Sequence, residues 1–149
     1  MSKDIFAPLV VNELFVTACE FQILGNPTDG MVNRLDFSLD ENLDESSDGL
    51  SRTIEQTLSV GTRLVSSEDE DDVRMRAGVT VYIQTECKAA SDSVEHIKQM
   101  VDYMRASSIS IAYGHARSYI ANMLAMSPVG NFLIPAIDPI ALLDKLSSE

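Results

Sequence analysis

The sequence contains few of the residues that build crosslinked, metal-binding or membrane-spanning proteins. Among its 149 residues there are two cysteines and no tryptophan. Cys19 and Cys87 form no Cys-x-x-Cys motif and no zinc-ligand spacing, so we interpret both as reduced thiols inside strands. No apolar run approaches the roughly 18 residues of a membrane-spanning helix. The first residues carry no secretion-signal pattern, so we expect a cytoplasmic protein.

Positive charge is also scarce. The chain has 11 Lys and Arg residues against 23 Asp and Glu residues, a formal net charge of −12. Nucleic acids and anionic membrane surfaces both attract Lys and Arg. The composition therefore argues against binding to either and favours an acidic surface suited to basic partners. With 45 % hydrophobic residues, the chain can build the core of a single domain spanning residues 1–149.

Catalytic and metal-binding motifs are absent from the sequence. There is no Gly-x-Ser-x-Gly, no Gly-rich phosphate loop and no His-Glu-x-x-His. The acidic run at residues 68–72 lacks the spacing of a calcium loop, and we interpret it as a solvated hairpin tip. Neither His96 nor His115 has a second ligand at metal-binding spacing. We expect no cofactor, no metal and no enzymatic activity, although a site assembled from distant residues stays open.

Four segments have the alternation of β-strands, at residues 9–24, 31–40, 50–65 and 73–87. In the first, simple alternation puts Val10, Leu14, Val16 and Ala18 on one face and Phe15, Cys19, Phe21 and Ile23 on the other. Residues 41–49 are acidic and polar, and we expect a loop there. The link at residues 66–72 is too short for a crossover, so it predicts an antiparallel hairpin.

The second half of the chain has helical spacing. Ser91, Asp92 or Ser93 can cap a first helix, and we expect a kink at Ser107-Ser108. An apolar stripe then follows at Ile109, Ala112, Tyr113, Ala116, Ile120, Met123 and Leu124. Pro128 and Gly130 predict its end, and Asp138-Pro139 predicts the start of a final helix. Strands followed by helices indicate an α+β fold, with a four-stranded antiparallel sheet covered on one face by long helices.

The apolar helix and its proline-rich exit resemble those of the SecB-type protein-export chaperones. The motif carrying the resemblance consists of Tyr113-Gly114-His115-Ala116-Arg117, Ile120, Met123, Gly130, Phe132, Pro135, and Asp138 through Leu142-Leu143. The strand at residues 34–39 also looks like the second strand of that family. Two features depart from the family pattern. Gly114-His115 occupies the stretch where the family usually carries a proline, and the chain ends soon after Leu146. Typical export chaperones have a longer tail, which helps engage the motor ATPase SecA.

The resemblance implies a holdase that keeps unfolded or precursor polypeptides export-competent and hands them to SecA, or a dedicated chaperone for another client such as an antitoxin. It implies a homotetramer, a dimer of dimers, with an interface that we expect at Ile109, Ala116, Ile120 and Leu124. The expected client-binding residues are Phe15, Phe21, Leu35, Phe37, Leu39, Tyr113 and Met123. An acidic face for a basic module of SecA is expected at Glu13, Glu20, Asp36, Asp40 and Glu55.

Two other interpretations remain open from the sequence. The chain is compatible with a small α+β ligand-binding enzyme whose acid or base is Asp36, Glu55 or His115, because fold class alone does not determine function. It is also compatible with a purely structural assembly subunit. Mixing the protein with an unfolded polypeptide separates these hypotheses, because only a holdase delays refolding at near-stoichiometric amounts.

Overall fold

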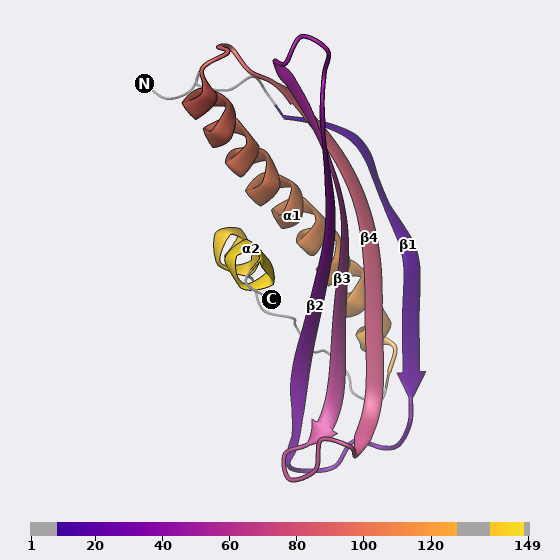
Figure 1. The fold of residues 1–149 in the computed structure, drawn as a ribbon. Helices are drawn as coiled ribbons and strands as arrows, with labels where there is room; N and C mark the ends of the chain where they lie inside the picture. The colour runs from indigo at the N-terminus through magenta and orange to yellow at the C-terminus, as the bar shows by residue number, and fades with distance from the viewer. Residues whose placement is uncertain (1–8, 128–137, 148–149) are drawn as a thin grey trace.

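The computed structural model describes residues 9–127 and 138–147 (Figure 1). Four strands come first: β1 (Val10–Ile23), β2 (Met31–Glu45), β3 (Ser51–Ser66) and β4 (Val73–Lys88). Two helices follow, α1 (Val94–Ala125) and α2 (Pro139–Ser147). This order confirms the predicted α+β class. The predicted helix-ending residues Pro128 and Gly130, and the motif residues Phe132 and Pro135, lie outside the described residues.

The strands form one antiparallel sheet in the order β1-β4-β3-β2. Sequential hairpins join β2 to β3 and β3 to β4. The first strand, β1, pairs with β4 on the side away from β3. Figure 1 shows both helices on the same face of the curved sheet, with α1 running along it. Helix α1 packs mainly on β4 and β3. The two edge strands, β1 and β2, therefore flank the helix on either side.

The core lies between α1 and the two central strands. In β3 the even-numbered residues from Ile54 to Leu64 are buried, and in β4 the odd-numbered residues from Met75 to Cys87 are buried. Their alternation matches the two-residue period of a pleated strand, as the sequence predicted. We call the helix-covered side of the sheet the inner face and the opposite side the outer face.

Strand β1 departs from simple alternation, and the predicted sharing of its faces is wrong. Its register against β4 shifts between Val11 and Glu13 and again between Val16 and Ala18. Each bulge inserts one residue and reverses which face the following side chains occupy. The inner face therefore carries Val11, Leu14, Val16, Cys19, Phe21 and Ile23, and the outer face carries Val10, Glu13, Phe15, Ala18, Glu20 and Gln22.

Strand β2 is longer than predicted. The acidic segment expected to begin a loop at residue 41 continues as strand to Glu45, and Leu43 pairs with Ile54 of β3. The local composition favoured a loop, but the ladder with β3 keeps these residues extended. The turn comes at residues 46–50, where Gly49 has a φ of 75° that suits glycine. There Asp48 accepts hydrogen bonds from the Ser46 hydroxyl and the Leu50 amide.

Both predicted helix starts are confirmed. Ser93 caps α1 by accepting a hydrogen bond from the His96 amide, and Asp138 caps α2 by accepting one from the Ile140 amide at 3.0 Å. Helix α1 is assigned as one helix through Ser107-Ser108, where a kink was expected. Ser108 is buried instead, with its hydroxyl oxygen 2.6 Å from that of Thr85 on β4. No described helix is both long and apolar enough to cross a membrane.

Candidate functional site

Three of the seven residues predicted to bind clients form an apolar row on the inner face of β2, which we call the β2 row. Leu35, Phe37 and Leu39 are half-buried and pack beside the main core. The Phe37 ring lies 5.9 Å from the ring of Tyr113 on α1, measured between centroids. Met123 is also half-buried and packs against the same core. Because β2 lies at the edge of the sheet, this row marks one flank of α1.

A second apolar surface lies on β1, at the other flank of α1. It consists of Val11, Cys19, Phe21 and Ile23, and we call it the β1 strip. Phe21 is 36 % exposed, Ile23 39 % and Val11 41 %. Phe21, which the sequence predicted as a client-binding residue, is therefore accessible in this chain. Helix α1, which packs on the central strands β4 and β3, lies between Phe21 and the β2 row, however, so the predicted client-binding residues do not form one continuous set.

Phe15 lies on the outer face and is separate from every other predicted client-binding residue. Its ring packs against that of Tyr82, with centroids 5.0 Å apart. The Tyr82 hydroxyl donates to Glu55 over 2.6 Å, and this hydrogen bond, more than burial or charge, raises the pKa of Tyr82 to about 12. The prediction that Phe15 joins Tyr113 in one groove is therefore wrong, because the bulges in β1 turn Phe15 away from the helices.

The five acidic residues predicted to form one face do share the outer face of the sheet, as their register shows: Glu13, Glu20, Asp36, Asp40 and Glu55. Two of them have partners, because Glu55 accepts from Tyr82 and Asp36 pairs with Arg63 at 3.1 Å. A shallow depression of about 480 Å³ crosses this face between Glu20 and Asp36, over Gly61 and Gly78. The acids thus border a surface built from small residues.

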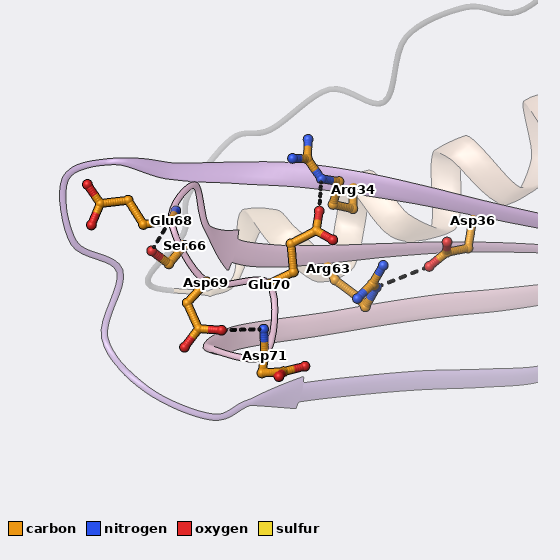
Figure 2. A network of polar contacts seen from close by, with 8 residues as sticks. All are labelled: Arg34, Asp36, Arg63, Ser66, Glu68, Asp69, Glu70 and Asp71. Atoms are coloured by element: carbon orange, nitrogen blue, oxygen red, sulfur yellow. Dashed lines mark hydrogen bonds and ion pairs between the residues drawn. The ribbon is translucent and has the colours of Figure 1, made fainter.

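The acidic hairpin between β3 and β4 is exposed, as expected for a solvated tip (Figure 2). Its one connection to the neighbouring strand β2 in Figure 2 runs from Arg34 to Glu70, where the guanidinium donates over 2.6 Å. That hydrogen bond lowers the pKa of Glu70 below its ordinary value. The backbone of the tip is shaped locally, since the Asp71 amide donates to the Asp69 carboxylate and the Glu68 amide to the Ser66 hydroxyl.

The residues expected at the oligomer interface lie inside the single chain. Ile109, Ala116, Ile120 and Leu124 are each 0 % exposed and belong to the core between α1 and the sheet. A side chain with no exposed surface in one chain has none to offer a second. The sheet of the same chain buries the apolar stripe of the helix. The prediction that these four residues form the oligomer interface is therefore wrong.

The sequence analysis missed a polar cluster that ties β2 to α1. Arg105 of α1 donates from Nε and Nη2 to the Glu41 carboxylate of β2, with the shortest distance 2.6 Å. Gln56 of β3 lies beneath and donates to the same carboxylate at 2.8 Å. Gln56 is 1 % exposed, and its Oε1 has no hydrogen-bond partner within the described part of the chain. The signal in the sequence was Gln56, a polar residue on the apolar face of its strand.

The residues considered as an enzymatic acid or base do not converge. Asp36 and Glu55 lie on the outer face of the sheet, while His115 lies on α1 with its ring 5.3 Å from that of Tyr119. The sheet separates the two carboxylates from the imidazole. These three residues therefore do not form a joint acid–base site.

Comparisons with known proteins identify a fold and no sequence family. No protein-family model matches the sequence, and a search of curated proteins finds no significant match. Among solved structures, the chain is similar to the Mycobacterium tuberculosis Rv1957 SecB-like chaperone, which was solved in complex with a ChAD peptide from the Rv1956 HigA1 antitoxin. The TM-score is 0.62 with 11 % sequence identity, over 87 % of this chain and 90 % of that one. This chain therefore has a SecB-like fold.

Proposed function

We propose that this chain is a molecular chaperone of the holdase type, which binds unfolded polypeptide segments and delays their folding. The observation that carries the proposal is the pair of apolar surfaces flanking α1, the β2 row and the β1 strip, on a sheet of SecB-like fold. Exposed apolar surface of this kind marks sites of interaction. The activity requires no nucleophile, no cofactor and no metal, so we propose that the chain is not an enzyme.

The test is the refolding of a denatured protein in the presence of this chain. A holdase binds the unfolded state, so it lowers the yield or rate of refolding at near-stoichiometric amounts. A structural subunit or an enzyme leaves refolding unchanged. An equal concentration of serum albumin controls for nonspecific crowding.

Two client classes are consistent with the fold. The similar Mycobacterium chaperone was solved with a peptide from an antitoxin, which supports a dedicated client of that kind for this chain. Handing precursor proteins to the motor ATPase SecA for export is the second candidate. It rests on the net charge of −12 and the acidic residues of the outer face. We propose cytoplasmic action for both.

We predict that Phe37→Ala weakens client binding more than it weakens the fold. Phe37 is half-buried beside Tyr113, so part of its ring already meets water. In a packed core this truncation costs about 3–5 kcal/mol, and partial exposure should reduce that to about half. Client affinity and urea unfolding are to be measured on the same samples, with Leu39→Ala as a second probe and Leu58→Ala as a fully buried control. Full destabilisation with intact client affinity would assign the ring to the core alone.

A separate prediction concerns the acidic face. Reversing charge with Glu20→Lys and Asp36→Lys should reduce affinity for a basic partner such as SecA, and the wild-type affinity should fall steeply with salt. Both side chains are exposed, so folding should change little. Surface plasmon resonance at several salt concentrations measures the effect. The pair Asp29→Lys and Glu95→Lys, exposed and off the outer face of the sheet, makes the same charge change as a control. Equal affinity for both variants and wild type would remove the partner-binding role.

The same surfaces support a proposal about the assembly state. We propose a homotetramer built as a dimer of dimers, consistent with the closed symmetry common among oligomers. The β1 strip and the free edge of β1 offer exposed apolar and hydrogen-bonding surface to a second copy. Light scattering should then report about four chains per particle.

A further inference from the structure

The sheet ends in two edge strands, and the β2 edge is the more regular of the two (Figure 1). Strand β2 pairs with β3 over all of its 15 residues without a register shift. Strand β1 carries two bulges, which protect an edge against further pairing. No described strand pairs with the other side of β2. Its outward backbone groups therefore form a long, unbroken template for another extended chain.

The inner face of this edge is self-complementary about Phe37. When a second copy lies antiparallel with the two Phe37 residues opposite each other, Leu35 of each copy faces Leu39 of the other. Further along, Met31 of each copy faces Leu43 of the other, a residue that is 45 % exposed in the single chain. The pairing with β3 places all five on the inner face. This register therefore covers the β2 row and Leu43 with apolar side chains.

The charges on the outer face match the same register. Arg34 of each copy faces Asp40 of the other, while Asp36 faces Ser38. Asp40 is exposed and has no hydrogen bond or ion pair among residues 9–127 and 138–147. Arg34 is exposed and donates to Glu70 through Nε, so the N–H groups of its two Nη atoms suit a second carboxylate. Two ion pairs between copies would therefore flank the central Phe37 pair.

Neighbouring registers are less favourable. A slide of two residues in one direction places Asp36 opposite Asp36 of the second copy. A slide of two residues in the other direction places Asp36 opposite Asp40. Like charges directly opposite each other oppose strand pairing. A slide of one residue turns the apolar side chains of one copy toward the outer face of the other. The residue order of β2 thus selects the register centred on Phe37.

We propose that two copies of this chain pair along their β2 edges, antiparallel and centred on Phe37, and that this contact covers the β2 row. The contact is symmetric, so each favourable pair forms twice. It uses the edge opposite to the β1 edge proposed for the tetramer, so it links further copies as the protein concentration rises. The pairing goes beyond the proposed function, because it requires no client.

One consequence concerns clients and does rest on the proposed function. The β2 row cannot contact a client segment and a second copy at the same time. Chains without a client would shield this row on each other, and a client would displace the second copy. A client strand added to the same edge is the alternative occupant. The matching of Arg34 with Asp40 about Phe37 favours the second copy, because it is a property of two identical strands.

Disulfide crosslinking tests the register. In a Cys19→Ser background, one preparation carries Ser38→Cys and the other Asp36→Cys, two exposed outer-face positions that face each other in the proposed pairing. Disulfides form only between closely approaching Cβ atoms. Mixed in a glutathione redox buffer, the two preparations should crosslink about tenfold faster than Ser38→Cys mixed with Asn42→Cys, which lie far apart in this register. Intact mass spectrometry measures the crosslinked dimer.

Charge reversal tests the ion pairs. Arg34→Glu or Asp40→Arg alone places like charges opposite each other twice, so association between copies should weaken about tenfold. The double variant Arg34→Glu, Asp40→Arg exchanges the two charges and should restore association. Sedimentation equilibrium over a concentration series measures it. Asp92→Arg, exposed and outside the sheet, makes the same change in net charge as Asp40→Arg and should leave association unchanged.

Equal crosslinking in the two cysteine mixtures, or no restoration in the double variant, would overturn the pairing. So would a Ser38→Cys chain that crosslinks to a cysteine-containing denatured protein but not to the Asp36→Cys chain, because the edge would then serve clients alone. A denatured protein without cysteine should lower crosslinking between copies, and unchanged crosslinking would show that the contact leaves the β2 row open. If the expected crosslink forms but the wild type does not delay refolding, the proposed function fails and the pairing stands. If refolding is delayed without the crosslink, the pairing alone fails.

Discussion

Replacing Ile120 by Asp should abolish the folded state of the chain. Ile120 is 0 % exposed in the core between α1 and the sheet. The change removes a buried aliphatic side chain, worth about 2–5 kcal/mol. It also buries a carboxylate without a cation, which costs several kcal/mol more. Domains of this size are stable by about 5–15 kcal/mol, so little stability should remain. Circular dichroism and urea unfolding should show no cooperative transition.

A matched variant on the β1 strip separates folding from assembly. Phe21→Asp introduces the same carboxylate at a side chain that is 36 % exposed, where water can reach it. We expect this variant to fold with a cooperative transition and to have a lower solution mass than the wild type. A folded but dissociated Ile120→Asp protein would contradict the structure, since it would place Ile120 at a contact between chains. An Ile120→Val variant, which keeps the apolar character, should cost about 1 kcal/mol.

The strands and helices were predictable because their periodicity is long and regular. Residues 73–87 alternate without a break, and the apolar stripe from Ile109 to Leu124 is the one that the structure buries. Burial of that stripe was predictable from sequence, but the surface that buries it was not. A helix stripe is satisfied equally well by the sheet of its own chain or by a second chain, and spacing does not distinguish them.

The faces of β1 were not predictable from alternation. A bulge needs only one extra residue, and neither Asn12 nor Thr17 carries a signal that marks one. The result changes which residues can act together, because Phe15 and Phe21 lie on opposite faces. The same bulges put Glu13 and Glu20, seven positions apart, on the outer face together. A period-two pattern would have separated them.

A groove between α1 and α2, lined by Tyr103 and Ile140, was missed because its residues have ordinary helical positions. Tyr103 and Ile140 are separated by 37 positions in the sequence, and nothing in the spacing of either helix shows that they meet. Asp102 and Asp144 look like solvated helix residues when each helix is considered alone. Only the packing of α2 beside α1 places the two carboxylates on one rim. Sites between elements distant in the sequence are the least accessible to pattern analysis.

Removing the Glu41 carboxylate should be among the most destabilising changes outside the apolar core. Its side chain is 16 % exposed and that of Arg105 is 27 % exposed. Glu41→Ala would leave the guanidinium without its ion-pair partner and the Gln56 amide with only a long 3.4 Å bond to the Arg105 carbonyl. Breaking one side of a buried pair costs about 3–5 kcal/mol, and the partial exposure here should lower that to about 2–3 kcal/mol. Urea unfolding measures the loss.

An intermediate variant and a control variant test the expected loss of stability in Glu41→Ala. Glu41→Gln keeps the shape and one acceptor, so it should lose about half as much stability, because only the charge and one hydrogen bond disappear. Asp40→Ala, next in the sequence but exposed on the outer face, should change stability by no more than about 0.5 kcal/mol. A Glu41→Ala protein as stable as Asp40→Ala would show that the cluster contributes nothing to the fold.

The pH dependence gives an independent check on the same cluster. Burial pushes the pKa of Glu41 upward, but hydrogen bonds from Arg105 and Gln56 and the charge of Arg105 outweigh it, so the pKa lies below its ordinary value of 4.5. A carboxyl group with a lowered pKa in the folded state stabilises that state above the unfolded pKa and loses the effect as pH falls through the folded one. The stability difference between wild type and Glu41→Gln should therefore be constant near neutral pH and shrink below about 4.5. A difference that grows on acidification would mean that Glu41 is destabilised by its burial and that Arg105 does not compensate.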